Sequence, residues 1–125
     1  MTVLVDTSVV IDYLRGLEGA ATILEAARIQ APLHASEITR AEVLTGMRKR
    51  EESATRSFLS TLVWHPVDEP VAERAGELGR QWIGSHNSID SADLVIAATA
   101  QLNECELLTC NVKHFPMFKK LKKPY

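Results

Sequence analysis

Carboxylate and amide side chains follow several short apolar segments of this 125-residue sequence. Asp6 ends the first apolar segment, Glu42 comes soon after the second, and Asn111 follows the last. Asp90 and Asp93 precede a long apolar stretch. Oxygen ligands without a nearby cluster of His and Cys side chains suit Mg²⁺ or Mn²⁺ rather than zinc. Two carboxylates about 4 Å apart repel by roughly 4 kcal/mol at an effective dielectric near 20, so a shared crevice would bind a proton or a cation.

Each carboxylate also has a structural interpretation. Asp6 can start a turn after a strand, and Glu42 can lie exposed on a helix beside Arg40. Asp90 and Asp93 fit a capping arrangement, with Asp90 as the N-cap and Asp93 at the third helical position. Capping explains Asp90 well. It explains Asp93 less well, because the apolar residues that follow predict a partly buried carboxylate that needs a partner.

Short apolar runs alternate with segments of helical periodicity along the chain. This alternation predicts an α/β fold with a mainly parallel sheet of about four or five short strands, flanked by helices on both faces. The ligand crevice of such a sheet lies at the carboxyl ends of the strands. The lysine-rich tail is expected to hold a short helical turn and an edge strand ending at Tyr125. The other expected strands are 2–6, 32–36, 63–67 and 105–109, and the expected helices are 8–15, 18–29, 37–49, 52–63, 69–84 and 90–103.

Length and composition predict a single domain over residues 1–125. The apolar fraction of 46% and the charged fraction of 24% exclude a disordered, collagen-like or coiled-coil chain. No apolar run approaches the ~18 residues that span a bilayer, and the first residues lack the basic segment of a secretory signal. We therefore expect a cytoplasmic protein in which Cys105 and Cys110 are reduced.

The formal net charge of -2 hides an uneven distribution. Residues 111–125 hold five lysines and no acidic residue, so all 16 acidic residues lie before them. This pattern is typical of a basic surface for a polyanion, or of a solvated lysine-rich end.

Four sequence blocks resemble one known family. The blocks are VDTSVVI, ASEITRAEVLTG, DLVIAATA and LLTCNVKHF. In this order they resemble the PIN domain of the VapC toxin ribonucleases, which belong to toxin–antitoxin pairs of bacteria and archaea. The resemblance extends from about Val3 to Phe118. It implies a three-layer α/β/α fold, a homodimer, and a small VapB-type antitoxin that lies across the active-site side and often places a basic side chain among the carboxylates.

The resemblance also implies roles for single residues. Asp6, Glu42 and Asp93 are the acidic residues expected to assemble the Mg²⁺ or Mn²⁺ site, and Asp90 is a further candidate ligand. Thr7 resembles the hydroxyl residue that supports this site. The remaining positions are Asn111, which stands where family members have Asp or Asn and would act as a supporting residue, and His114, which stands where many members have Asp.

The expected activity is metal-dependent endoribonuclease cleavage of structured RNA such as transfer RNA or ribosomal RNA. A metal held mainly by Asp6 and Asp93 would generate hydroxide and offset charge on the phosphate, while Glu42 orients or deprotonates the water. Basic side chains would hold the RNA backbone and make binding salt-sensitive. The candidates are Lys113, Lys119 and Lys120 in the tail, and a second patch of Arg40, Arg48, Lys49 and Arg50.

Three other functions are alternatives. A response-regulator receiver needs paired acids after the first strand, and a haloacid-dehalogenase-type phosphatase needs Asp-x-Asp there, where this sequence has Ser8. A non-catalytic PIN-like binding module would use the carboxylates to dock a basic peptide, or would bind RNA without cutting it. Metal-dependent cleavage separates the enzyme from such a module.

Overall fold

Strands and helices alternate along the chain in the computed structural model, which describes residues 2–125. The strands are β1 (Val3–Val5), β2 (His34–Ser36), β3 (Val63–His65) and β4 (Glu106–Leu108). The helices are α1 (Thr7–Leu14), α2 (Glu18–Gln30), α3 (Glu37–Gly46), α4 (Glu52–Leu59), α5 (Glu69–Trp82) and α6 (Ser91–Leu102). Two short 3-10 helices, η1 (Lys49–Glu51) and η2 (Val112–His114), complete the elements.

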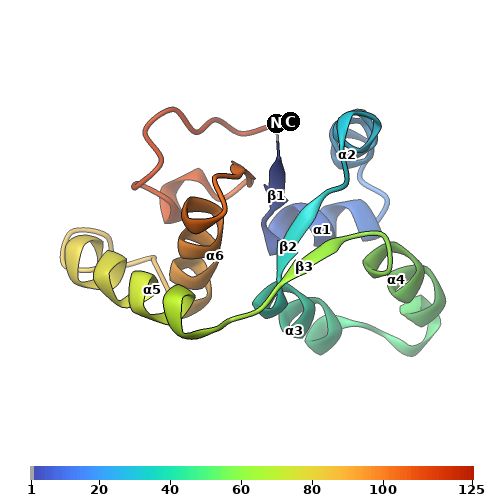
Figure 1. The fold of residues 1–125 in the computed structure, drawn as a ribbon. Helices are drawn as coiled ribbons and strands as arrows, with labels where there is room; N and C mark the ends of the chain where they lie inside the picture. The colour runs from blue at the N-terminus through green and yellow to red at the C-terminus, as the bar shows by residue number, and fades with distance from the viewer. Residues whose placement is uncertain (1) are drawn as a thin grey trace.

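The sheet has the strand order β3-β2-β1-β4, and every neighbouring pair is parallel. Leu4 in β1 lies opposite His34 on one side and Leu107 on the other. Helices cover both faces, which gives the expected three-layer α/β/α arrangement (Figure 1). Because all four strands run the same way, their carboxyl ends meet at one edge, and the two chain ends lie together at the opposite edge (Figure 1).

Alternating side chains of β1 divide the core into two clusters. Leu4 packs with apolar residues of α5 and α6, together with Phe115 from the segment after η2. Val5 packs with apolar residues of α1, α2 and α4. Successive strand residues point to opposite faces, so both clusters meet at β1. The residue that follows, Asp6, is therefore anchored from both sides of the sheet.

Several element boundaries differ from the expectation. The helix expected over residues 52–63 ends at Leu59, and Val63 begins β3 instead. Two further boundaries differ for physical reasons. The helix expected over residues 37–49 ends at Gly46, because Met47 adopts an extended backbone and η1 begins a separate turn. The strand expected over residues 63–67 ends at His65, since Pro66 has no N–H to continue a strand ladder.

The expected edge strand at the chain end is wrong: residues 119–125 form no strand. Tyr125 lies against α1 and α2 rather than beside β4. Its hydroxyl donates to Asp12 Oδ2 at 2.7 Å, and its side chain packs so closely on Gly19 that a Cβ there would lie 2.9 Å from Tyr125 Cβ. Within residues 2–125, no helix is both long and apolar enough to cross a bilayer.

Candidate functional site

Asp6 lies at the carboxyl end of β1, directly before α1. Its side chain is 3% exposed and makes no capping bond to the helix. Instead, Oδ2 accepts hydrogen bonds from the Ser8 hydroxyl at 2.7 Å and from the Thr109 hydroxyl at 2.6 Å. No hydrogen bond within residues 2–125 reaches Oδ1. Since no buried polar side-chain atom in this part of the chain lacks a partner, Oδ1 reaches solvent and is free to bind a ligand.

Asp93 lies in the first turn of α6 and is 8% exposed. A reciprocal capping box holds it: the Asp93 N–H donates to Asp90 Oδ1 at 2.9 Å, and the Asp90 N–H donates to Asp93 Oδ2 at 3.1 Å. The structure thereby confirms the capping interpretation of Asp90. His114 Nδ1 lies 3.0 Å from the same Oδ2. As at Asp6, the contacts within the described chain occupy Oδ2 and leave Oδ1 without a partner.

Glu42 is a half-buried residue of α3, the helix that follows β2. The Thr7 hydroxyl donates to Glu42 Oε1 at 2.6 Å. The same hydroxyl lies 3.0 Å from Oγ1 of Thr39, a fully buried residue one turn before Glu42 on α3. This hydroxyl pair joins α1 to α3, so it fixes the carboxylate of Glu42 relative to Asp6.

The negative charges of the site carboxylates are not neutralised, and this affects the pKa of Asp93. The pKa of Asp93 is raised from 3.8 to about 6, and burial is the largest cause. The negative charges of Asp90 and Asp6 raise this pKa further, whereas the capping N–H of Asp90 and the charge of His114 lower it. The contribution of Asp6 reflects the proximity of the two carboxylates.

The side chains that could bind a metal here suit Mg²⁺. They do not suit a metal that is coordinated entirely by protein ligands. Within residues 2–125, no three side chains of Asp, Glu, His or Cys gather closely enough to form such a metal cage. Mg²⁺ does not require one, because it is usually bound by one or two carboxylates, keeps several waters and binds substrate phosphates. The free Oδ1 atoms of Asp6 and Asp93 meet that requirement.

The other candidate residues are placed differently. Asn111 contributes its backbone, which donates to the Thr109 hydroxyl at 2.9 Å, while its side chain is exposed. Lys113 is exposed on η2, one residue before His114. Arg40 pairs with Glu37 and lies over the Trp64 ring, 4.0 Å from its centroid.

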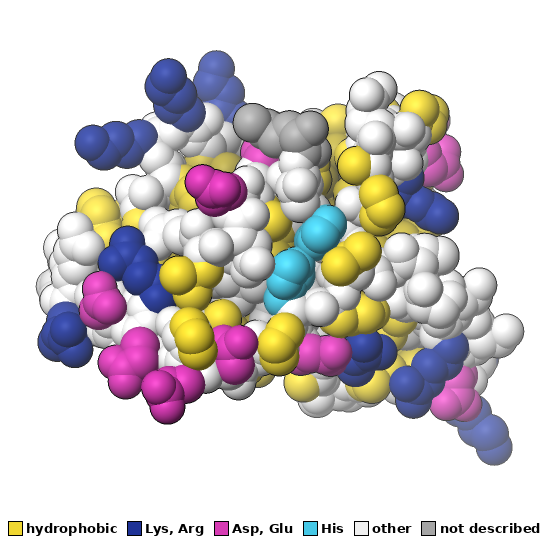
Figure 2. All heavy atoms as spheres, viewed as in Figure 1, with side chains coloured by type: hydrophobic (Ala, Val, Ile, Leu, Met, Phe, Trp, Pro, Cys, Tyr) yellow, Lys and Arg dark blue, Asp and Glu magenta, His cyan; other side chains and the backbone are white. Residues whose placement is uncertain are grey.

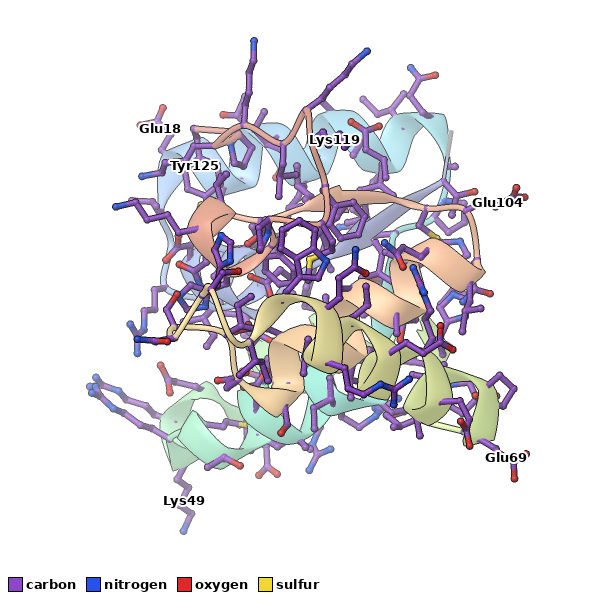
Figure 3. The ribbon with its side chains drawn as sticks, turned by 90° about the vertical axis from the view of Figure 1, so that its left-hand side faces the viewer. Glu18, Lys49, Glu69, Glu104, Lys119 and Tyr125 are labelled. Atoms are coloured by element: carbon purple, nitrogen blue, oxygen red, sulfur yellow. The ribbon has the colours of Figure 1, made fainter. Side chains whose placement is uncertain are left out.

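Within residues 2–125, Lys119 and Lys120 form no ion pair with the carboxylates. Lys119 and Tyr125 lie toward one end of the molecule, whereas Lys49 lies toward the other (Figure 3). Basic side chains gather both near the chain ends and over the region of α3 and α4 (Figure 2). The protein therefore has two separate basic regions.

Comparison with known proteins assigns the family. The family described as PIN domain matches residues 3–122. The chain belongs to the PIN domain family. Ribonuclease VapC19 of Mycobacterium tuberculosis is 44% identical over 123 residues, which cover 98% of each chain. Ribonuclease VapC10 of the same organism is 42% identical, over 98% of this chain and 92% of the relative.

Solved structures show the same PIN fold. A chain of a toxin-antitoxin complex from Klebsiella pneumoniae superposes with a TM-score of 0.84 at 34% identity, and the match covers 99% of this chain and 98% of that one. A chain of VapBC2 from Rickettsia felis, bound to a DNA fragment, superposes with a TM-score of 0.80 at 24% identity. The similarity to the Rickettsia felis chain shows the fold alone.

Sequence reasoning missed three residues that position the carboxylates of this PIN domain: Ser8 and Thr109, which bind Asp6 directly, and Thr39, which acts through Thr7. Each uses a hydroxyl, and Thr39 and Thr109 are fully buried. A signal was present for two of them. Thr109 is a polar residue at the end of an apolar strand, and Thr39 lies three residues before Glu42, on the same face of the helix.

Proposed function

We propose that this PIN domain is a Mg²⁺- or Mn²⁺-dependent endoribonuclease and the toxin of a toxin–antitoxin pair. The observation that carries the proposal is the pair of buried carboxylates, Asp6 and Asp93, each held through Oδ2 and each with a free Oδ1. Relatives at 42–44% identity are named ribonucleases, which agrees with hydrolysis of RNA.

Asp6 and Asp93 would hold the metal through their free oxygens. When bound, a divalent ion supplies a water that is acidic enough to become hydroxide near neutral pH, and it offsets charge on the phosphate. Glu42 would orient or deprotonate the attacking water, and the Thr7 hydroxyl, which donates to Glu42 Oε1, keeps Glu42 in place. Outer contacts of this kind commonly matter 10- to 100-fold for activity or metal affinity.

His114 positions Asp93. Its Nδ1 lies within hydrogen-bond distance of Oδ2, the atom that also accepts from Asp90. These two partners keep Oδ2 occupied and leave Oδ1 free. The His side chain therefore supports a carboxylate at the place where many PIN domains carry another acid.

An antitoxin partner follows from the same charges. A chain from a toxin-antitoxin complex shares 34% identity with this protein. A VapB-type antitoxin that places a basic side chain between Asp6 and Asp93 would neutralise the pair as a cation does. We further propose that the toxin is a homodimer, which light scattering of the purified protein would measure directly.

The deciding experiment is cleavage of total cellular RNA by antitoxin-free protein. The wild-type protein should cut RNA with Mg²⁺ or Mn²⁺ and stop in EDTA, and Asp6→Asn should be inactive although folded. If the wild type is folded but cuts no transfer or ribosomal RNA with either metal, the non-catalytic binding module becomes the better explanation.

A further inference from the structure

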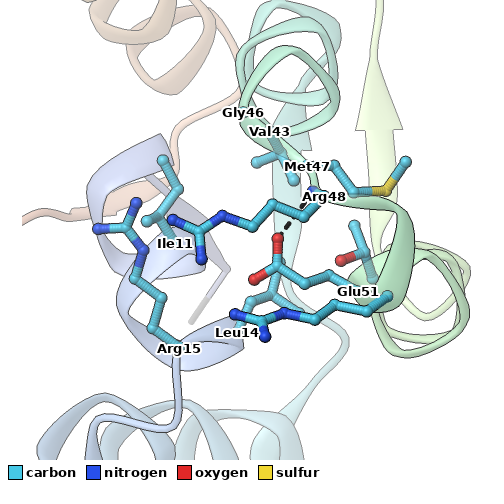
Figure 4. Close-up of a pocket in the computed structure, with 10 residues that line it drawn as sticks. Ile11, Leu14, Arg15, Val43, Gly46, Met47, Arg48 and Glu51 are labelled. Carbon is cyan, nitrogen blue, oxygen red and sulfur yellow. Dashed lines mark hydrogen bonds between the residues drawn. The ribbon is translucent and has the colours of Figure 1, made fainter.

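A pocket of about 390 Å³ lies beside the candidate site, between the second half of α1 and the end of α3 (Figure 4). Three arginines line it: Arg15 from the end of α1, and Arg48 and Arg50 from the segment around η1. The apolar side chains of Ile11, Leu14 and Met47 also contribute to its lining. The pocket thus combines guanidinium groups with an apolar wall.

The positive charge of this pocket is not neutralised. Within residues 2–125, Arg15, Arg48 and Arg50 form no ion pair. One acidic side chain, Glu51, lines the pocket, and its Oε1 accepts a hydrogen bond from the backbone N–H of Arg48 at 2.8 Å. Arg15 and Arg48 lie on facing walls with the Glu51 carboxylate beside them (Figure 4). Three guanidinium groups and one carboxylate leave a local excess of positive charge that favours an anion.

The pocket is close to the proposed active site along two helices. Ile11 lies four residues after Thr7 on α1, and Gly46, which also lines the pocket, lies four residues after Glu42 on α3. Four helical residues correspond to about 6 Å of rise. A single RNA strand that passes the carboxylates would therefore reach the pocket within a few nucleotides.

We propose that this pocket binds one unpaired nucleotide of the RNA, next to the phosphate that is cut. Guanidinium groups match phosphate oxygens through paired hydrogen bonds. The apolar wall and the arginine planes suit a base that has left its helix, because unpaired bases stack on such surfaces. The inference rests on the proposed ribonuclease function and assigns a substrate contact to Arg15, Arg48 and Arg50.

The test is binding of RNA in EDTA, where no cleavage is expected. A fluorescent single-stranded oligoribonucleotide and a duplex of the same sequence would be titrated with wild-type protein, Arg48→Ala, Arg50→Ala and Arg80→Ala. Arg80 is the matched control, because it is an exposed arginine of α5 that does not line the pocket. We expect each variant of a pocket arginine to bind the single strand about tenfold more weakly. Arg80→Ala should stay within twofold of wild type, and the duplex should show little difference among the proteins.

Equal losses in all three variants would overturn the proposal, since they would indicate a diffuse basic surface. Unchanged RNA affinity in the arginine variants, with weaker binding of a cognate antitoxin, would also overturn it and would assign the pocket to a protein partner. Because binding is measured without divalent metal, failure of the cleavage experiment would not alter this result. The two proposals are thus tested separately.

Discussion

At the scale of single residues, the site depends on which oxygen of each carboxylate is occupied. Ser8 and Thr109 bind Oδ2 of Asp6, and His114 and the Asp90 N–H bind Oδ2 of Asp93. In this orientation each carboxylate still makes hydrogen bonds through Oδ2. The arrangement also keeps two negative charges close together. A pH effect should follow from this arrangement.

Asp93 should make the metal-free protein less stable as the pH rises. Its pKa is raised from 3.8 to about 6 in the folded protein, so the folded state holds the proton more tightly than the unfolded chain. The free energy of unfolding should therefore fall between about pH 4 and pH 6, by about 3 kcal/mol at about 1.4 kcal/mol per pH unit, and change little above that range from this group.

Asp93→Asn should remove this fall while abolishing metal-dependent cleavage. Asn retains an oxygen that accepts the capping N–H of Asp90, so the fold should persist. Thermal melts in EDTA between pH 4 and pH 8 would measure the difference. Identical pH dependence in the two proteins would contradict the assigned role of the Asp93 charge, and retained cleavage would remove Asp93 from the metal site.

Thr7→Val should lower cleavage by 10- to 100-fold, because Glu42 loses the hydroxyl that positions it. The unfolding free energy should fall by about 1 kcal/mol. Thr99→Val is the matched control, since Thr99 is fully buried and its hydroxyl bonds only within α6, to the Val95 carbonyl at 2.7 Å. Cleavage assays and urea unfolding of both variants would separate a loss of orientation from a loss of stability. Equal activities would show that Thr7 has no orienting role.

At the scale of elements, the beginnings of α1 and α6 bring Asp6 and Asp93 together, but through different contacts. Asp6 occupies the N-cap position and leaves the helix uncapped by its side chain. Asp90 caps α6 and in turn binds Oδ2 of Asp93 through its own N–H, which leaves Oδ1 of Asp93 free. The sequence pattern was sufficient to predict the second arrangement, because an N-cap Asp with an acid three residues later is a local signal.

Asp90→Ala should destabilise the protein by about 1 kcal/mol, whereas Asp90→Asn should be nearly neutral because Asn caps almost as well as Asp. Urea unfolding measures both. If Asp90 acts only as a cap, Asp90→Asn keeps most of the cleavage activity. A large loss of activity in folded Asp90→Asn would instead place Asp90 in the metal site.

Gly19→Ala should displace the chain end from α2, because a Cβ there would lie 2.9 Å from Tyr125 Cβ. The matched comparison is Tyr125→Phe, which keeps the ring and loses only the bond to Asp12. We expect a loss of about 0.5–1.5 kcal/mol for Tyr125→Phe and a larger loss for Gly19→Ala. Thermal melts would test this order, and equal stability of all three proteins would show that the tail contributes nothing.

At the scale of the whole molecule, the parallel α/β fold could be predicted from sequence, since strand and helix periods alternate clearly, whereas the choice of Asp6, Glu42 and Asp93 as site residues came from the resemblance to PIN domains. The path of the tail could not. Residues 119–125 resemble an exposed strand locally, but a contact between Tyr125 and Gly19 across the molecule decides their course. The positions of Thr39 and Thr109 carried a signal, but their partners Thr7 and Asp6 could not be identified, because they are far away in the sequence and only the fold brings them near.

The separation of the two basic regions predicts separate effects. We expect Lys119→Ala with Lys120→Ala to reduce the salt dependence of single-stranded RNA binding by about 1.4 in slope, if both contact phosphate. The rate of cleavage at saturating RNA should not change, since within residues 2–125 neither lysine forms an ion pair with the site carboxylates. An unchanged slope would identify the tail as solvated surface.

The pairing of β1 with β4 has a consequence during synthesis. Asp6 and Asp93 leave the ribosome before Thr109 and His114, which orient the two carboxylates. Until those later residues have been synthesised, a nascent chain carries both acidic residues without the contacts that align them. Toxicity should therefore require the segment that holds Thr109 and His114, and a chain truncated before Thr109 should be harmless in a cell that lacks antitoxin.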